Sequence, residues 1–328
     1  MNASVIIPAY NAAGTIAKTL EALTRQDYKG PFEVIVVDDG STDDTPAAVK
    51  HFPNVKYVRQ DNAGPAAARN HGARLAAGQH LCFTDSDCVP HADWLTLLLN
   101  GFHRLDITVV AGSYGIANPQ SRLARGIHRE ILFRHTHLLP QFPKVFGSYN
   151  FCVKKEMFER VGGFETTYRQ ASGEDNDLSY KILAAGGRIY FEPKALVDHH
   201  HTTALVKYWR EQFRHGFWRA KMYAEHPRMA RGDDYTFWKD MIEVPWACAG
   251  LMALALSVFK ISFLKAIIYF LWLPFLVFEI GFAFKIGLDF FDAIFFGFVM
   301  LVRSLVRTFG LSTGILHFGA KKSQKKVK

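Results

Sequence analysis

Short apolar runs alternate with helical patterns along the first 90 residues of the chain. Four strand-like runs lie at 4–8, 33–37, 55–59 and 80–84, and the first two, which are rich in aliphatic β-branched residues, are typical of buried strands. Helical patterns follow the first three runs, at 15–24, from Thr45 onward and at 65–77. Because continuous apolar strands separated by helices are typical of covered sheets, the pattern predicts an α/β fold with a mostly parallel sheet and helices on both faces.

Beyond residue 107 the pattern becomes mixed. Strand-like and helical stretches alternate at 107–111, 121–138, 174–185 and 188–192. An amphipathic helix with many basic residues is then expected over 204–224, because its apolar positions recur at helical spacing. The α/β domain is therefore expected to extend to about residue 225.

The C-terminal third is far more apolar than the rest. Residues 244–259 carry no charge, residues 266–284 carry one acid, Glu279, and residues 286–302 carry two. A helix needs about 20 apolar residues to cross a bilayer core, so these runs predict membrane-associated helices. Two crossings are favoured, with residues 286–318 along the interface. Four crossings, or a soluble helical subdomain with a very apolar core, stay open.

The formal net charge of +9 is unevenly distributed along the chain. Residues 1–200 carry 21 basic and 21 acidic side chains, whereas residues 303–328 carry 7 basic side chains and no acid. A neutral body argues against a nucleic-acid groove, and a basic C-terminal stretch fits an anionic membrane surface. The positive-inside tendency then places the N-terminal domain and the tail in the cytoplasm, at the inner (cytoplasmic) membrane.

Four segments are expected from these patterns. They are an α/β domain at 1–225, a linker at 226–241, hydrophobic membrane-associated helices at 242–320 and a basic tail at 321–328. The four cysteines, Cys82, Cys88, Cys152 and Cys248, form no CxxC pair and are expected to be free thiols in a reducing cytosol. The chain starts directly with a strand-like run, so no removal of a signal peptide is expected.

Two acidic clusters follow strands of the predicted sheet. Asp38 and Asp39 close the second strand, and Asp85 and Asp87 follow the fourth. Ligands bind at the carboxyl ends of parallel strands, so both clusters are expected in one crevice. An Asp-x-Asp pair offers hard oxygen ligands to a divalent cation. Capping of the following helix is the alternative use of such side chains.

Two further clusters carry candidate chemistry. Glu174 and Asp175 open a helical pattern, where a carboxylate serves either as a partner of the helix dipole or as a general base. Three histidines, at 199–201, follow a strand-like run. Side chains alternate between the faces of a strand, so at most His199 and His201 point the same way. Metal ligands and polar surface histidines are both open at this point.

Six motifs occur together, in a fixed order. They are VIIPAYN (5–11), VVDDGSTDDT (36–45), NAGPAAARNHG (62–72), FTDSD (83–87), GGFE (162–165) and GEDNDL (173–178). In this order and spacing the chain resembles glycosyltransferase family 2 over about residues 3–220. The resemblance implies a GT-A fold and the transfer of a sugar from a nucleotide sugar with inversion.

The resemblance also assigns residues to the nucleotide-sugar donor. It implies that Pro8 and Tyr10 flank the base, that Asp39 accepts a hydrogen bond from the base beside Asp38, that Arg69 lies on the nucleotide-side helix and that Asp85 faces the ribose. A uridine diphosphate donor is the default expectation, by its frequency in the family.

The remaining assignments concern the cation, the base and the acceptor. By the same resemblance, Asp87 and His199 are ligands of a divalent metal, Mn²⁺ or Mg²⁺, and Asp175 is the catalytic base. Glu174, Arg214 and His215 are candidate contacts of the acceptor or its phosphate. The basic helix that carries Arg214 and His215 is equally suited to lie against lipid headgroups.

One departure from the family narrows the expected reaction. Processive polysaccharide synthases carry Gln-x-x-Arg-Trp, whereas this chain has Gln212-Phe-Arg-His-Gly. The expected function is therefore the transfer of one sugar, by a hexosyltransferase acting on a lipid-linked or cell-envelope glycan acceptor. A catalytically silent GT-A-fold membrane scaffold is the alternative, and the presence of Asp87 and Asp175 argues against it.

Overall fold

A computed structural model describes residues 2–103, 106–168, 172–227, 234–236, 238–257 and 262–326, without the side chains of 256–257, 262–268 and 320–326. The chain forms two compact units. The first contains Met1–Asn118 and His135–His201, and the second contains Pro119–Arg134 and Thr202–Lys328. Each unit is described by itself.

The first unit is built on an eight-stranded sheet in the order β3-β2-β1-β4-β7-β6-β8-β5. Its strands are β1 (Ala3–Ala9), β2 (Phe32–Asp38), β3 (Val55–Arg59), β4 (His80–Thr84), β5 (Cys88–Pro90), β6 (Val109–Ile116), β7 (Asn150–Lys154) and β8 (Ile189–His199). Strands β1 to β4 pair in parallel, β7 is antiparallel to both β4 and β6, and β5 is antiparallel to β8. The expected parallel half-sheet is confirmed. Beyond residue 107 the sheet is mixed, because β6 and β8 pair in parallel while β7 and β5 pair antiparallel to their neighbours.

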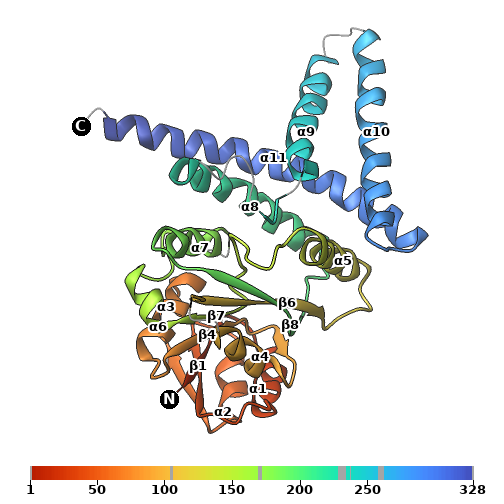
Figure 1. Ribbon diagram of the computed structural model, residues 1–328. Helices are drawn as coiled ribbons and strands as arrows, with labels where there is room; N and C mark the ends of the chain where they lie inside the picture. Colours follow the sequence, from red (N-terminus) through yellow and green to blue (C-terminus); the bar gives the residue numbers. More distant parts are fainter. Residues whose placement is uncertain are drawn as a thin grey trace. The chain divides into compact units, whose positions relative to one another are not determined.

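Helices cover both faces of this sheet (Figure 1). They are α1 (Ile16–Thr24), α2 (Thr45–Lys50), α3 (Pro65–Leu75), α4 (Trp94–Asn100), α6 (Lys155–Arg160) and α7 (Glu174–Ala184), with a 3₁₀ turn at Gly101–His103. Strand β1 shows why its apolar run is continuous. Val5 and Ile7 join the core under α1 and α4, while Ile6 joins the opposite core under α3 and α7. Both faces of a central strand are buried, so every residue must be apolar or hydrogen-bonded.

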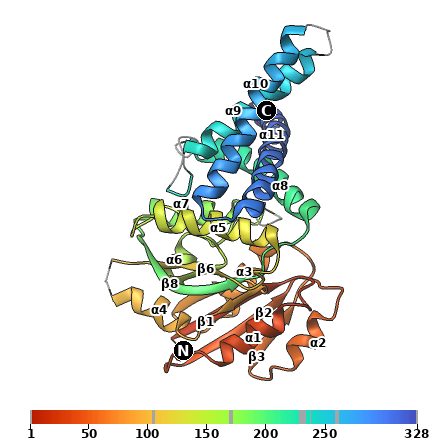
Figure 2. The ribbon, with the colours of Figure 1, turned by 90° about the vertical axis from the view of Figure 1, so that its right-hand side faces the viewer.

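The second unit consists of helices. They are α5 (Arg122–His137, through Arg134), α8 (Leu205–Glu225), α9 (Trp238–Ser257), α10 (Ser262–Lys285) and α11 (Phe290–Lys326). Helices α9 and α10 lie side by side, and α8 runs along α11 (Figures 1 and 2). Glycines allow α8 and α11 to approach closely: a Cβ at Gly216 would lie 2.3 Å from the Arg307 carbonyl oxygen. The domain boundaries expected at residues 225, 241 and 320 stay predictions, and α8 packs within this second unit.

The second unit buries several charged side chains and exposes large apolar ones. Its buried side chains include Glu130, Arg134, Lys239, Asp240, Glu243, Glu279 and Arg303. These charges are paired: Arg303 lies 2.5 Å from Glu130 and 3.1 Å from Glu243, and Lys239 contacts both Glu243 and Glu279. Large apolar side chains face outward instead, among them Phe270, which is 76% exposed, and Leu316, which is 74% exposed. Paired charges inside the unit therefore occur together with large apolar side chains on its surface.

Among the described residues, the helix that is long and apolar enough to cross a membrane is α11, over Phe290–Gly319. This is the segment that the sequence placed along the interface. The run at 244–259 lies in α9, which also carries Lys239, Asp240 and Glu243, and its last two residues fall outside the described chain. The run at 266–284 begins where side chains are not described. One such helix is weak evidence of membrane association, and two crossings stay a prediction.

Candidate active site

The two acidic strand ends lie at the same edge of the sheet. Strands β2 and β4 flank β1 on either side and run parallel to it. Asp38 and Asp39 stand at the end of β2, and Asp85 and Asp87 follow β4. The topology thus places both clusters at the carboxyl ends of parallel strands, where open α/β sheets bind ligands.

Asp38 is fully buried, and its carboxylate is paired within the protein. It accepts hydrogen bonds from the Ser41 amide at 2.7 Å and the Tyr57 hydroxyl at 2.5 Å, and Arg59 lies 3.8 Å away. Burial and the Asp38 carboxylate raise the pKa of Tyr57 to about 12, so the phenol stays a donor. Asp38 therefore fixes the loop after β2. Its predicted place beside the base stays a prediction.

Asp39 organises the loop that leads into α3. One carboxylate oxygen accepts from the Gln60 side chain at 2.7 Å and from the Ala63 amide at 2.9 Å, and the other accepts from the Gly64 amide at 2.8 Å. Gly64 has a φ of +93°, which favours glycine. A carboxylate offers about four lone-pair sites, so the three bonds leave Asp39 able to accept one more, and its predicted bond to the base stays a prediction.

Pro8 and Tyr10 stand at the end of the neighbouring strand. Pro8 is buried in β1 in register with Val37 of β2, two residues before Asp39. Tyr10 follows the strand and is 53% exposed. An exposed aromatic ring beside Asp39 is suited to cover a base by stacking, and this role stays a prediction.

Arg69 connects residues from three separate motifs. Its buried guanidinium donates to Asp85 at 2.7 Å and to Glu174 at 3.2 Å. Its Nε has no hydrogen-bond partner among the described residues. The sequence predicted Arg69 and Asp85 on the donor side and Glu174 on the acceptor side. The structure brings all three together, because the Arg69 guanidinium binds both Asp85 and Glu174. Glu174 is therefore the ion-pair partner of Arg69.

Asp175 lies at the start of α7, next to Glu174. The helix follows Gly173, whose φ of +106° belongs to the left-handed region that favours glycine. One oxygen of Asp175 accepts from the Asn176 amide at 2.8 Å. Burial and the neighbouring Glu174 carboxylate raise the pKa of Asp175 to about 7. A general base works best when its pKa lies near the operating pH, so this environment suits the predicted role.

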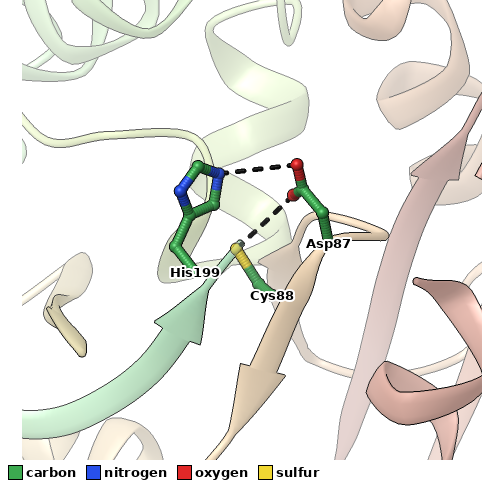
Figure 3. A group of neighbouring side chains, drawn as sticks. All are labelled: Asp87, Cys88 and His199. Atoms are coloured by element: carbon green, nitrogen blue, oxygen red, sulfur yellow. Dashed lines mark hydrogen bonds and ion pairs between the residues drawn. The ribbon is translucent and has the colours of Figure 1, made fainter. Parts of the chain in front are cut away.

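The third group contains Asp87, Cys88 and His199 (Figure 3). Asp87 Oδ2 lies 3.5 Å from His199 Nε2, and Cys88 Sγ lies 3.9 Å from Asp87 Oδ1. The antiparallel pair of β5 and β8 creates this proximity, because Cys88 is in register with His199 and the His200 amide donates to the Asp87 carbonyl. The structure therefore brings together the two residues that the sequence predicted as metal ligands.

These residues fit a hard divalent cation. A carboxylate oxygen and an imidazole nitrogen are suitable ligands of Mn²⁺, and both atoms face the same point. Cys88 was not predicted. Its thiol is buried, and burial together with Asp87 and Asp85 raises its pKa well above the ordinary value. A neutral thiol is a poor ligand, so Asp87 and His199 are the residues that would hold the cation.

The histidine run has the predicted alternation. His199 and His201 lie together, with their Nδ1 atoms 2.9 Å apart, whereas His200 is exposed. The Tyr114 ring of β6 lies 5.1 Å from the His199 ring and stacks on Tyr149 at 3.6 Å. No pattern in the sequence pointed to Tyr114, because its contact depends on the pairing of β6 with β8.

Arg214 and His215 belong to α8 in the second unit. His215 is exposed, and Gln212, in the same short motif, accepts a hydrogen bond from Arg307 of α11 at 2.8 Å. The Gln212 side chain thus joins α8 to α11 inside the second unit. The roles of Arg214 and His215 toward an acceptor stay predictions.

Known proteins share both the motifs and the fold. Residues 4–162 match the family described as Glycosyl transferase family 2, and residues 128–205 match the N-terminal domain of galactosyltransferase. The glycosyltransferase AglE of Haloferax volcanii is 31% identical over 221 residues, which are 65% of this chain and 71% of that protein. The chain belongs to glycosyltransferase family 2. The expected transferase class is thereby confirmed.

Two further comparisons extend this family assignment. The pre-mycofactocin glycosyltransferase of Mycobacterium tuberculosis is 32% identical over 240 residues, or 68% of this chain, and the chain spans about half (48%) of that relative. The mannosyltransferase PcManGT from Pyrobaculum calidifontis, in complex with GDP-Man and Mn²⁺, superposes with a TM-score of 0.61 at 22% identity. The match covers 94% of this chain and 86% of that one. It confirms the GT-A-like fold of this family 2 member.

Proposed function

We propose that this family 2 enzyme is a metal-dependent, inverting transferase that moves one sugar from a nucleotide sugar to a lipid-linked or cell-envelope glycan acceptor. A uridine diphosphate donor stays the default. The reaction would occur at the cytoplasmic face of the inner membrane, as a step of polysaccharide biosynthesis. The observation that carries the proposal is the network Asp85–Arg69–Glu174, which ties the donor-side strand end to the helix of the candidate base.

The donor side is supported by Asp87 and His199. A cation held by these two residues would stabilise the negative charge that develops on the leaving nucleoside diphosphate. Asp39 and Tyr10 stand at the adjacent strand ends, in position to orient the base. Asp85 is held by Arg69 and is partly exposed, so one of its oxygens can accept from a ribose hydroxyl.

The acceptor side is supported by Asp175. As a carboxylate it can take the proton from an acceptor hydroxyl while the hydroxyl oxygen attacks the anomeric carbon. The C–O bond to the diphosphate breaks at the same time, on the opposite face of the sugar. Attack from the face opposite the leaving group inverts the anomeric configuration. A pKa of about 7 lets Asp175 accept the proton at neutral pH and release it again.

Membrane association is supported by the second unit. Its exposed Phe and Leu side chains surround buried ion pairs, and α11 contains a 30-residue candidate span. A lipid-linked acceptor would keep its chain in the bilayer and offer its polar head at the surface. The Gln212–Arg307 contact supports single transfer, because the glutamine of the altered motif packs between helices.

A donor screen tests the proposal. The full chain in detergent is incubated with a panel of uridine, guanosine and thymidine diphosphate sugars, with Mn²⁺, Mg²⁺ or EDTA, and the released nucleotide is detected by mass spectrometry. Guanosine diphosphate mannose belongs in the panel because PcManGT binds it. We expect one donor to be consumed, in a cation-dependent manner. Consumption of none, together with calorimetry that shows no cation-dependent nucleotide binding, would favour the silent scaffold.

A further inference from the structure

We propose that His201 is a positioning residue that fixes the tautomer of His199 and thereby makes His199 a competent metal ligand. The inference rests on the proposed metal dependence and concerns a residue outside the predicted ligand set. It starts from one contact: the Nδ1 atoms of His199 and His201 lie 2.9 Å apart. That distance is typical of a hydrogen bond between two ring nitrogens.

A hydrogen bond between two neutral imidazoles has two arrangements, because only one of the facing nitrogens carries the proton. When His199 Nδ1 carries it, His199 Nε2 has a free lone pair and can bind a cation. When His201 Nδ1 carries it, His199 Nε2 is protonated and faces Asp87 as a donor, 3.5 Å away. The two states exclude each other. A cation bound by both Asp87 and His199 Nε2, with the Nδ1–Nδ1 hydrogen bond kept, therefore needs His201 Nδ1 as the acceptor.

Buried contacts hold the His201 ring in place beside His199. The ring is 2% exposed and lies 5.8 Å from the Tyr114 ring. Its backbone is clamped by Asn118, whose side-chain amide donates to the His201 carbonyl at 2.7 Å and accepts from the His201 amide at 3.0 Å. The partner of His199 is thus fixed by buried contacts of its own, as outer partners of metal-binding histidines usually are.

Two variants of nearly equal shape separate this role from packing. His201→Asn keeps an acceptor oxygen near the position of Nδ1, and His201→Leu does not. Both lose the same ring contacts. His200→Leu is the control, because His200 is exposed and contributes only its backbone amide to Asp87. The measurement is Mn²⁺ affinity of the full chain in detergent with uridine diphosphate, from the electron paramagnetic resonance signal of free Mn²⁺.

We expect His201→Leu to raise the Mn²⁺ dissociation constant about 10- to 100-fold, and His201→Asn to stay within a few-fold of the unaltered chain. His200→Leu should have no effect. Equal affinity in the leucine and asparagine variants would overturn the inference while metal dependence stands. No Mn²⁺ binding by the unaltered chain would overturn both.

Imidazole ¹⁵N resonances of the unaltered chain give a second readout that needs no stable variant. With Mg²⁺ and uridine diphosphate bound, we expect His201 to carry its proton on Nε2 and His199 to carry its proton on Nδ1. A His201 protonated on Nδ1 in that complex contradicts the inference.

Discussion

Arg69 and Glu174 lie 105 positions apart in the sequence, yet their side chains form a buried ion pair at 3.2 Å. The pair joins α3, which follows the loop held by Asp39, to α7, which carries the candidate base. Glu174 also accepts from the Ser172 amide at 2.7 Å. Both ends of the candidate site, at Asp85 and at Glu174, therefore depend on the buried Arg69 guanidinium.

Removal of the Arg69 charge should destabilise the enzyme strongly. Arg69→Met keeps an unbranched apolar stem but leaves Glu174 as a buried carboxylate without the guanidinium that pairs with it. We expect the free energy of unfolding to fall by about 3 kcal/mol, since loss of one partner of a buried pair is costly. The double variant Arg69→Met with Glu174→Gln should recover part of this loss. Thermal unfolding of the single and the double variant measures this recovery. An equal loss of stability in the two variants would contradict the Arg69–Glu174 ion pair.

The pH dependence of activity should report Asp175. With a pKa of about 7, the carboxylate is half ionised at neutral pH, so kcat/KM should rise through about pH 7. The Glu174 charge helps to raise this pKa, so Glu174→Gln should move the midpoint to lower pH. Asp175→Asn should abolish this rise and lower kcat by at least about 100-fold. A midpoint that does not move in Glu174→Gln would contradict the electrostatic coupling.

Whereas activity should rise with pH, the free energy of unfolding should fall as Asp175 ionises. The pKa of Asp175 is higher in the folded chain than in the unfolded one, where it lies near 4. The folded state therefore binds the proton more tightly, and its contribution to stability is lost as pH rises through about 7. Asp175→Asn cannot ionise at this position, so it lacks this loss. Between pH 5 and pH 8 its melting temperature should therefore fall less than that of the unaltered enzyme.

The candidate cation site offers a matched test at adjacent positions. Asp87→Asn keeps the shape but removes the charge, so Mn²⁺ affinity should fall by about 100-fold or more. Cys88→Ala removes a buried neutral thiol and should leave the affinity within a few-fold. Titration of Mn²⁺ against nucleotide release measures both. A large effect of Cys88→Ala alone would make the thiol a ligand.

The parts of the site that sequence predicted are those set by local pattern. The apolar runs at 33–37 and 80–84 predict β2 and β4, and the acids that follow these two strands were expected at one edge of the sheet. The pairing of Cys88 with His199 could not be predicted physically, since a three-residue strand carries almost no periodic signal and its partner lies more than 100 residues away. The resemblance placed His199, and strand alternation grouped His201 with it. Cys88 enters only through the pairing of β5 with β8, and Tyr114 through the pairing of β6 with β8.

The C-terminal helices show a second limit of prediction from sequence. Apolar runs indicated where helices occur, but hydropathy does not reveal that charges lie inside the unit. Lys239 and Glu243 precede the uncharged run at 244–259, and they pair with Glu279 and Arg303 from other helices. From hydropathy alone, charged residues are expected at the surface. Here they are buried, because partners from other helices form ion pairs with them.

Close packing of α8 on α11 yields the last prediction. A Cβ at Gly310 would lie 2.1 Å from the Phe213 carbonyl oxygen, whereas a Cβ at Gly319, on the same helix, meets no atom within 4 Å. Gly310→Ala should therefore force the helices apart and lower stability by about 1–3 kcal/mol. Gly319→Ala should be neutral or stabilise by up to about 1 kcal/mol, because alanine favours helix. Thermal unfolding of both variants in detergent measures the difference. Equal melting temperatures would show that α8 and α11 do not pack at Gly310.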